Sequence, residues 1–250
     1  MTVRVLLLGG TAEARRLASL LATDQDLDIV SSLAGRVRAP TLPVGEVRIG
    51  GFGGPAGLAD WLAAERIDAV IDATHPFAAT ITANANEATG RLGVPFVVLR
   101  RPGWQQGPAD DWHWVDTVAD AATRLPALGR RVFLATGRGD LAAFADRDDL
   151  WFLLRAVDPP PPPLPANRVI VRGRGPFDVP GELALLRHHR VDVVVARDSG
   201  GDHVAAKLTA ANTLGLPVLV ARRPPLPDVP VVTTERAAAD WLAGVRHQPS

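Results

Sequence analysis

A glycine-rich turn near the start of the chain is the first candidate for chemistry. An apolar run from Val3 to Leu8 is followed by Gly9, Gly10 and Thr11, and an alanine-rich helical pattern begins at once. Glycine lets a backbone approach a ligand closely, and a helix N-terminus attracts anions. We therefore expect this turn to bind a nucleotide phosphate. A plain helix-start turn is the alternative, because the full dinucleotide pattern G-x-G-x-x-G is absent.

The end of the second predicted strand indicates which dinucleotide would bind. NAD-binding domains place Asp or Glu there to hold the ribose hydroxyls. Here the strand predicted over residues 27–33 contains Ser31 and Ser32 near its end, and Arg36 follows. Serine hydroxyls and an arginine can bind a 2′-phosphate, which a carboxylate would repel. This pattern favours NADP(H), with a solvated loop charge as the alternative for Arg36.

Two further strand ends of the first half carry glycine or polar residues. Gly50 and Gly51 follow a strand predicted at 47–49, while Thr74 and His75 follow an apolar run that starts at residue 67. Because ligands of parallel sheets bind at the carboxyl ends of strands, we expect these four residues to contact the cofactor. His75 could also donate a proton to a substrate, or it could simply stabilise its own turn.

The second half of the chain carries similar turns, which we expect to hold a substrate. One begins at Thr136 and another at Ser199, and the only lysine of the chain, Lys207, follows the second turn. A lysine retained among arginines indicates a need for a compact ammonium, with chance retention as the alternative. We assign Lys207 to substrate carboxylate or cofactor contact, and proton donation is its second possible role. The substrate-binding candidates are Thr136, Gly137, Arg138, Arg174, Ser199, Gly200, Gly201 and Lys207.

Strands that alternate with helices position these turns, which predicts an α/β fold with parallel sheets. The apolar segment 67–71 recurs as 191–195, and Arg100-Arg101-Pro102 recurs as Arg222-Arg223-Pro224. Several elements repeat in order at a nearly constant offset, which predicts two similar Rossmann-like domains with a cleft between them. We place the NADPH-binding domain at 1–122 and a substrate-binding and closure domain at 123–250. One long continuous sheet is the alternative.

Composition restricts the class of protein. The 250 residues have a formal net charge of zero and no cysteine. The absence of a basic stripe argues against a nucleic-acid partner, and no apolar run is long enough to span a membrane. We find no metal-binding motif, and the first apolar run is too short for a signal peptide. We therefore expect a cytoplasmic protein that binds no metal.

A series of motifs carries a resemblance to a known family. In order along nearly the whole chain occur L-L-L-G-G-T-A-E-A-R, S-L-A-G-R, R-I-G-G-F-G-G, I-D-A-T-H-P-F-A, T-G-R, R-G-P-F and S-G-G followed by K-L. Together they resemble the precorrin-6A reductase family of cobalamin biosynthesis. The resemblance implies NADPH-dependent reduction of precorrin-6A to precorrin-6B, by hydride delivery to a ring double bond. It also implies two domains with the cofactor and the substrate between them.

The implied substrate is a tetrapyrrole-derived polycarboxylate, so its binding site should carry cations. Cations near predicted strand ends of the second half are Arg138, Arg155, Arg172, Arg174, Arg197 and Lys207. Arginine pairs well with carboxylates, and we expect one NADPH per chain, bound by the first half. Two other functions stay open at this point, namely a non-catalytic NADP(H) sensor and an NADPH oxidoreductase for another small substrate.

Overall fold

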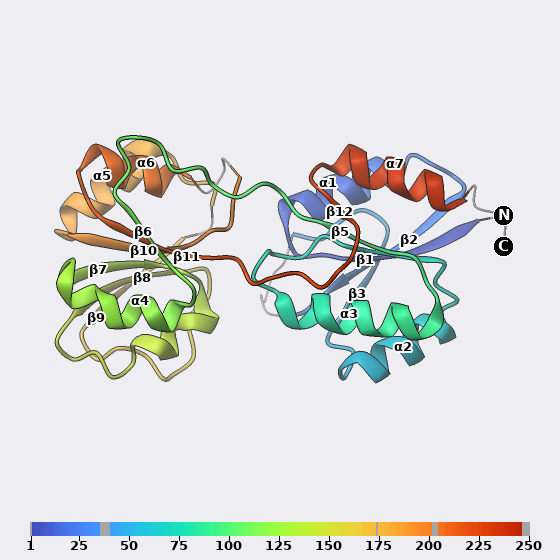
Figure 1. The fold of residues 1–250 in the computed structure, drawn as a ribbon, viewed down its shortest axis with the longest axis horizontal. Coiled ribbons are helices and arrows are strands. Elements are labelled where there is room, and N and C mark those ends of the chain that lie inside the picture. Colours follow the sequence, from blue (N-terminus) through green and yellow to red (C-terminus); the bar gives the residue numbers. More distant parts are fainter. Residues whose placement is uncertain (1, 36–40, 174, 202–204, 247–250) are drawn as a thin grey trace. The chain divides into compact units, whose positions relative to one another are not determined.

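The chain forms two six-stranded sheets whose strands are all parallel, each with helices on both faces (Figure 1). The computed structural model describes residues 2–35, 41–173, 175–201 and 205–246. The predicted α/β fold is therefore confirmed, and the alternative of one continuous sheet is wrong. Within the described residues, no helix combines the length and the apolar character that a membrane span requires.

The first sheet has the strand order β12-β5-β4-β1-β2-β3. Its strands are β1 (Val3–Leu8), β2 (Leu27–Leu33), β3 (Glu46–Ile49), β4 (Ala69–Asp72), β5 (Phe96–Leu99) and β12 (Val231–Val232). Its helices are α1 (Ala12–Leu21), α2 (Pro55–Ala64), α3 (Ala79–Leu92) and α7 (Glu235–Arg246). Helices α1 and α7 cover one face through Leu17 and Leu242, and α2 and α3 cover the other through Leu58 and Ala85 (Figure 1).

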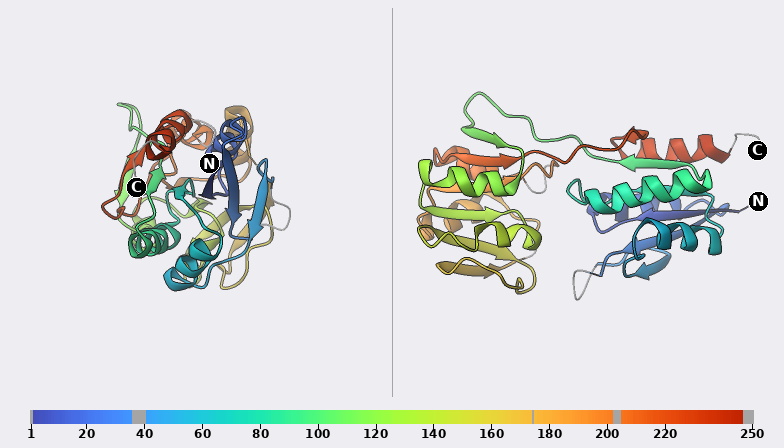
Figure 2. Two further views of the ribbon diagram at one scale, coloured as in Figure 1. Left: turned by 90° about the vertical axis from the view of Figure 1, so that its right-hand side faces the viewer. Right: turned by 60° about the horizontal axis from the view of Figure 1, so that its bottom comes forward.

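The second sheet has the order β6-β11-β10-β7-β8-β9. Its strands are β6 (Trp112–Val115), β7 (Arg131–Ala135), β8 (Trp151–Ala156), β9 (Arg168–Arg172), β10 (Val193–Arg197) and β11 (Val218–Ala221). Its helices are α4 (Val118–Arg124), α5 (Val179–His188) and α6 (Ala206–Thr213), with two 3₁₀ helices, η1 (Leu125–Ala127) and η2 (Arg138–Phe144). Figure 2 shows the layers of each sheet from two further sides.

The two sheets repeat the same topology. Strands β1, β4 and β5 of the first sheet occupy the positions that β7, β10 and β11 occupy in the second. A side-chain contact repeats as well. Asp68 accepts the backbone N–H of Arg4 at 2.8 Å, and Asp192 accepts that of Arg131 at 2.8 Å. The sequence repeat therefore reflects two similar structural units.

The boundary between the units differs from the expected division at residues 122 and 123. Unit 1 contains 1–102 and 224–250, and unit 2 contains 103–223. Strand β6 pairs with β11 in unit 2, whereas β12 pairs with β5 in unit 1. Unit 2 is one continuous segment that begins with β6 and α4. Unit 1 is completed by β12 and α7, which follow unit 2 in the sequence. The sequence repeat cannot reveal which edge strand joins which sheet, because β6 and β12 occupy equivalent edge positions in two similar sheets.

Candidate functional site

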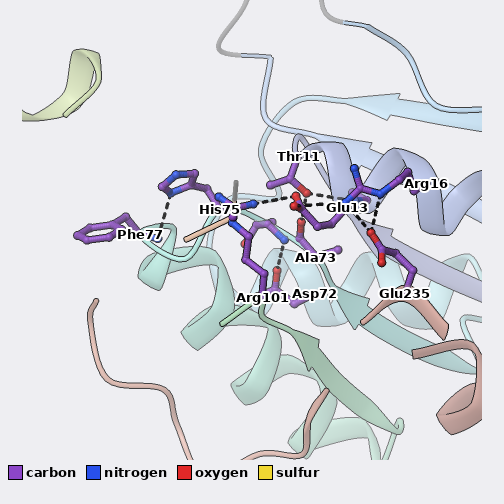
Figure 3. Close-up of polar contacts among 12 residues, drawn as sticks. Thr11, Glu13, Arg16, Asp72, Ala73, His75, Phe77, Arg101 and Glu235 are labelled. Carbon is purple, nitrogen blue, oxygen red and sulfur yellow. Dashed lines mark hydrogen bonds and ion pairs between the residues drawn. The ribbon is translucent and has the colours of Figure 1, made fainter. Parts of the chain in front are cut away.

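The first glycine turn lies between β1 and α1 and is held by Thr11 (Figure 3). The Thr11 hydroxyl oxygen accepts the N–H of Ala14 at 3.1 Å, which caps α1. The same hydroxyl donates to the carbonyl of Ala73 at 2.7 Å and so ties the turn to the end of β4. The Thr11 side chain is thereby committed to the turn itself, and the backbone of the turn is the part that can meet a ligand.

The space above this turn is open. Gly10 has a φ of +108°, and a Cβ built on it would meet no described atom within 4 Å. A Cβ on Gly9, by contrast, would contact Ala14 and Leu33 at 3.5 Å. Gly10 therefore presents bare backbone at a helix N-terminus, which is the geometry that binds phosphate.

A pocket lies beside the turn, at the carboxyl ends of β1 and β2. Its lining residues are Gly9, Gly10, Ala14, Arg15, Ser31, Leu33, Thr41 and Pro43. No carboxylate is among them. Ser31 is 1% exposed, and its hydroxyl has no hydrogen-bond partner among the described residues. A buried hydroxyl without a partner is costly, so a polar ligand in this pocket would relieve that cost.

Ser32 and Arg36 are two further cofactor candidates from the sequence. Ser32 is buried next to Ser31 but does not line the pocket, since successive residues of a strand face opposite sides. Arg36 lies outside the described residues. Their proposed contacts with a cofactor stay predictions.

The side chain of an arginine in β3 binds the backbone of the loop that follows this strand. Arg48 donates to the carbonyls of Gly50 at 2.7 Å and Gly51 at 2.8 Å, and its guanidinium lies 3.8 Å from the centre of the Phe52 ring. A Cβ at either glycine would meet no described atom within 4 Å. The loop therefore has two backbone carbonyls bound by Arg48 and open space above its glycines, although neither glycine lines the pocket.

A buried carboxyl organises the turn that carries Thr74 and His75. Asp72, at the end of β4, accepts the N–H of Thr74 at 2.9 Å and the hydroxyl of Thr82 at 2.6 Å. His75 Nδ1 accepts the N–H of Phe77 at 3.2 Å (Figure 3). An acceptor at Nδ1 leaves the proton of a neutral imidazole on Nε2. His75 therefore stabilises its own turn through Nδ1.

Two carboxyls at this edge of the sheet differ in electrostatics. Asp72 is 1% exposed, and burial raises its pKa even though the hydrogen bonds from Thr74 and Thr82 act in the opposite direction. Burial also acts to raise the pKa of Glu13. A hydrogen bond from its own backbone N–H and the charges of Arg101 and Arg16 outweigh burial and leave that pKa below its usual value (Figure 3).

We expect the Asp72→Asn variant to gain stability relative to the wild type as the pH rises. A raised pKa means that the folded chain holds this proton more tightly than the unfolded chain does. This tighter proton binding stabilises the fold at pH values below the pKa that Asp72 has in the unfolded chain. The stabilisation is lost as the pH rises through the pKa that Asp72 has in the folded chain. Asparagine has no such proton to lose.

The measurement is the thermal unfolding midpoint of both proteins between about pH 4 and about pH 8. The variant's midpoint minus that of the wild type should increase with pH. Asp60→Asn, at an exposed position on α2, corrects for the general effect of removing a negative charge from unit 1. A difference that stays constant across the range contradicts the raised pKa.

The corresponding turn of unit 2 has a different environment. Gly137 has a φ of +95°, but a Cβ built on it would lie 3.0 Å from Nη2 of Arg197. Arg197 also forms an ion pair with Asp140 at 3.2 Å. The turn leads into a 3₁₀ helix rather than an α-helix, and Thr136 is buried there. A guanidinium therefore occupies the space that is open above Gly10 in unit 1.

The Ser199–Gly201 turn belongs to a tightly connected cluster in unit 2. Asp198 accepts the N–H of Trp104 at 2.9 Å and pairs with Arg223 at 3.1 Å. The Trp104 indole donates to the carbonyl of Gly201 at 3.2 Å. The guanidinium of Arg223 therefore lies beside the Asp198 carboxylate and offsets its charge.

Lys207 lies on α6 within the same cluster and is 6% exposed. Its ammonium is 4.7 Å from the centre of the Trp104 ring, a cation–π contact. Among the other predicted cations of unit 2, Arg155 and Arg197 have ion-pair partners, whereas Arg172 is exposed at the end of β9. Arg155 pairs with Glu182 and stacks 3.7 Å over Phe177. Arg174 lies outside the described residues, which also leave out the side chain of Arg138.

Sequence reasoning passed over Arg15 and assigned no role to Asp72. A carboxylate inside the apolar run of β4 was the available signal for Asp72. Arg15 had no such signal, because its place beside Ser31 depends on how α1 packs against β2.

The fold and the first turn define an α/β protein of two similar units, one of which has an open glycine turn at a helix N-terminus. The sequence pattern of precorrin-6x reductases (CbiJ/CobK) matches residues 4–243. The precorrin-6A reductase of Rhodococcus erythropolis is 55% identical over 236 residues, which are 94% of this chain and 95% of that protein. A solved structure of CobK precorrin-6A reductase is 44% identical, has a TM-score of 0.92, and aligns over 100% of this chain and 99% of its own.

The chain belongs to the precorrin-6x reductase family. Relatives named cobalt-precorrin-6A reductase are more distant. The one from Priestia megaterium is 27% identical over 236 residues, with 88% of this chain and 90% of that protein covered.

Proposed function

We propose that this chain reduces precorrin-6A to precorrin-6B in cobalamin biosynthesis, with NADPH bound at the glycine turn of unit 1. Membership of the reductase family supports this reaction, since a relative 55% identical over nearly the whole chain is named a precorrin-6A reductase. That membership argues against the two alternatives, a non-catalytic sensor and a reductase of another small molecule. The cytoplasmic location and the lack of a nucleic-acid partner stay predictions.

The observation that best supports NADPH is the pocket beside Gly10. It combines open backbone at the N-terminus of α1, a buried Ser31 hydroxyl without a described partner, and a lining without carboxylates. These features fit a phosphorylated ribose and its phosphates. When bound, the cofactor supplies a hydride.

The remaining roles follow from this placement. Reduction of a ring double bond adds a hydride and a proton, and His75 or Lys207 is our candidate for donating the proton. Gly50, Gly51 and Thr74 are proposed as further cofactor contacts at the same edge of the unit 1 sheet. The turns of unit 2, with Lys207, are proposed to hold the acidic groups of the substrate.

We propose that the substrate carries no cobalt. The chain shares 55% identity with a precorrin-6A reductase but only 27% with a cobalt-precorrin-6A reductase. The difference in identity is the observation that supports this point.

The test is anaerobic incubation of the chain with NADPH and either metal-free or cobalt-containing precorrin-6A. We expect the nicotinamide absorbance to fall and the macrocycle spectrum to change together, at equal molar amounts, with the metal-free substrate. Binding of NADPH without any change in either spectrum would instead identify a sensor. Faster turnover of the cobalt form would overturn the choice of substrate.

A further inference from the structure

Arg15 lines the pocket beside the glycine turn. It is the fourth residue of α1, and it lines the pocket together with Ser31. Side chains of an α-helix generally lean back toward its N-terminus, which for α1 is the end that carries the glycine turn. A cation and a buried hydroxyl thus face the same space from two different elements.

The charge of Arg15 is not used elsewhere in the described structure. Its neighbours Arg16 and Arg101 form ion pairs with Glu13 at 3.4 and 2.7 Å. For the Arg15 guanidinium, the described residues provide neither a hydrogen bond nor an ion pair, and the pocket lining contains no acid. The pocket therefore has a positive charge available for an anionic ligand.

Position along the sheet identifies the anion. Ser31 pairs with Leu7 in the parallel ladder, one residue from the end of β1. In dinucleotide-binding sheets, this end of the second strand meets the adenosine ribose, whereas the pyrophosphate lies at the helix N-terminus. An arginine presents paired N–H donors that match a phosphate, which a ribose hydroxyl does not require.

We propose that Arg15, together with the Ser31 hydroxyl, binds the 2′-phosphate of NADPH and thereby selects it over NADH. This inference rests on the proposed function, because it concerns the same cofactor. It adds a specificity residue on α1 to the one expected from sequence, Arg36, which lies in the segment after β2.

The experiment titrates the full chain with NADPH, NADH, adenosine 2′,5′-bisphosphate and AMP, and follows binding by calorimetry. Arg15→Gln should weaken NADPH and the bisphosphate by about ten- to a hundredfold, and NADH and AMP by less than about twofold. Arg15→Lys should fall between, since it keeps the charge and loses the paired donors. Arg91→Gln on α3, where the arginine pairs with exposed Glu87, is the matched control and should bind as wild type does.

Three outcomes would overturn the inference. Unchanged NADPH affinity in a folded Arg15→Gln variant would do so, as would equal losses for NADPH and NADH, which indicate a pyrophosphate contact. A preference that disappears in Arg36→Ala and persists in Arg15→Gln would assign the selection to Arg36 alone. If the wild-type chain binds NADPH more tightly than NADH, each of these outcomes contradicts the role of Arg15 and leaves the proposed function standing. A wild type that binds neither dinucleotide overturns both.

Discussion

The Gly10→Val variant is expected to lose NADPH binding by more than about a hundredfold while both units stay folded. A Cβ built at this position meets no described protein atom within 4 Å, so a valine there would begin in the open space above the turn. There it would exclude the phosphate and deprive it of the N–H groups at the start of α1. Calorimetric titration measures the loss, and circular dichroism checks the fold.

Backbone strain must be separated from this steric effect. Valine at a φ of +108° costs about 1–3 kcal/mol of stability. Gly93, which ends α3, also has a positive φ, +68°, and open space around a built Cβ. Gly93→Val should therefore lower stability and leave NADPH affinity unchanged. A folded Gly10→Val protein with wild-type affinity would place the cofactor elsewhere.

Loss of the Lys207 ammonium is expected to lower kcat/KM by about ten- to a hundredfold, the usual effect of removing one charged contact with a reactant. Because Lys207 is buried against Trp104, Lys207→Met is a better variant than Lys207→Ala. Methionine keeps an apolar stem in the same space and removes only the charge. The KM for the macrocycle should rise, and the affinity for NADPH should not change.

Arg187→Gln, an exposed position on α5, is the matched control for losing a positive charge from unit 2. The same titrations should give one NADPH per chain, since Arg197 lies where a second phosphate would approach Gly137. Unchanged kinetics in a folded Lys207→Met enzyme, or two bound NADPH molecules, would contradict this division of roles between the units.

The sequence by itself determined the fold class, the repeat and the family. Apolar runs that end in glycine turns, as at Gly10 and Gly137, are local patterns, and each predicts a strand followed by a turn regardless of distant residues. The order of the family motifs was equally readable. The observed strands β1, β2 and β3 lie within one residue of the ranges predicted from those patterns.

The tertiary structure decided which strands share a sheet and which side chains share a pocket. Strand β6 joins the sheet of unit 2, and β12 that of unit 1, because edge pairing depends on residues more than a hundred positions away, such as Val231 beside Val98. Packing likewise turns Ser31 toward the pocket and away from water, and places Arg15 at the same pocket. The sequence shows a carboxylate in the apolar run of β4 but not its raised pKa, because the pKa of Asp72 rises only when neighbouring elements exclude water from it.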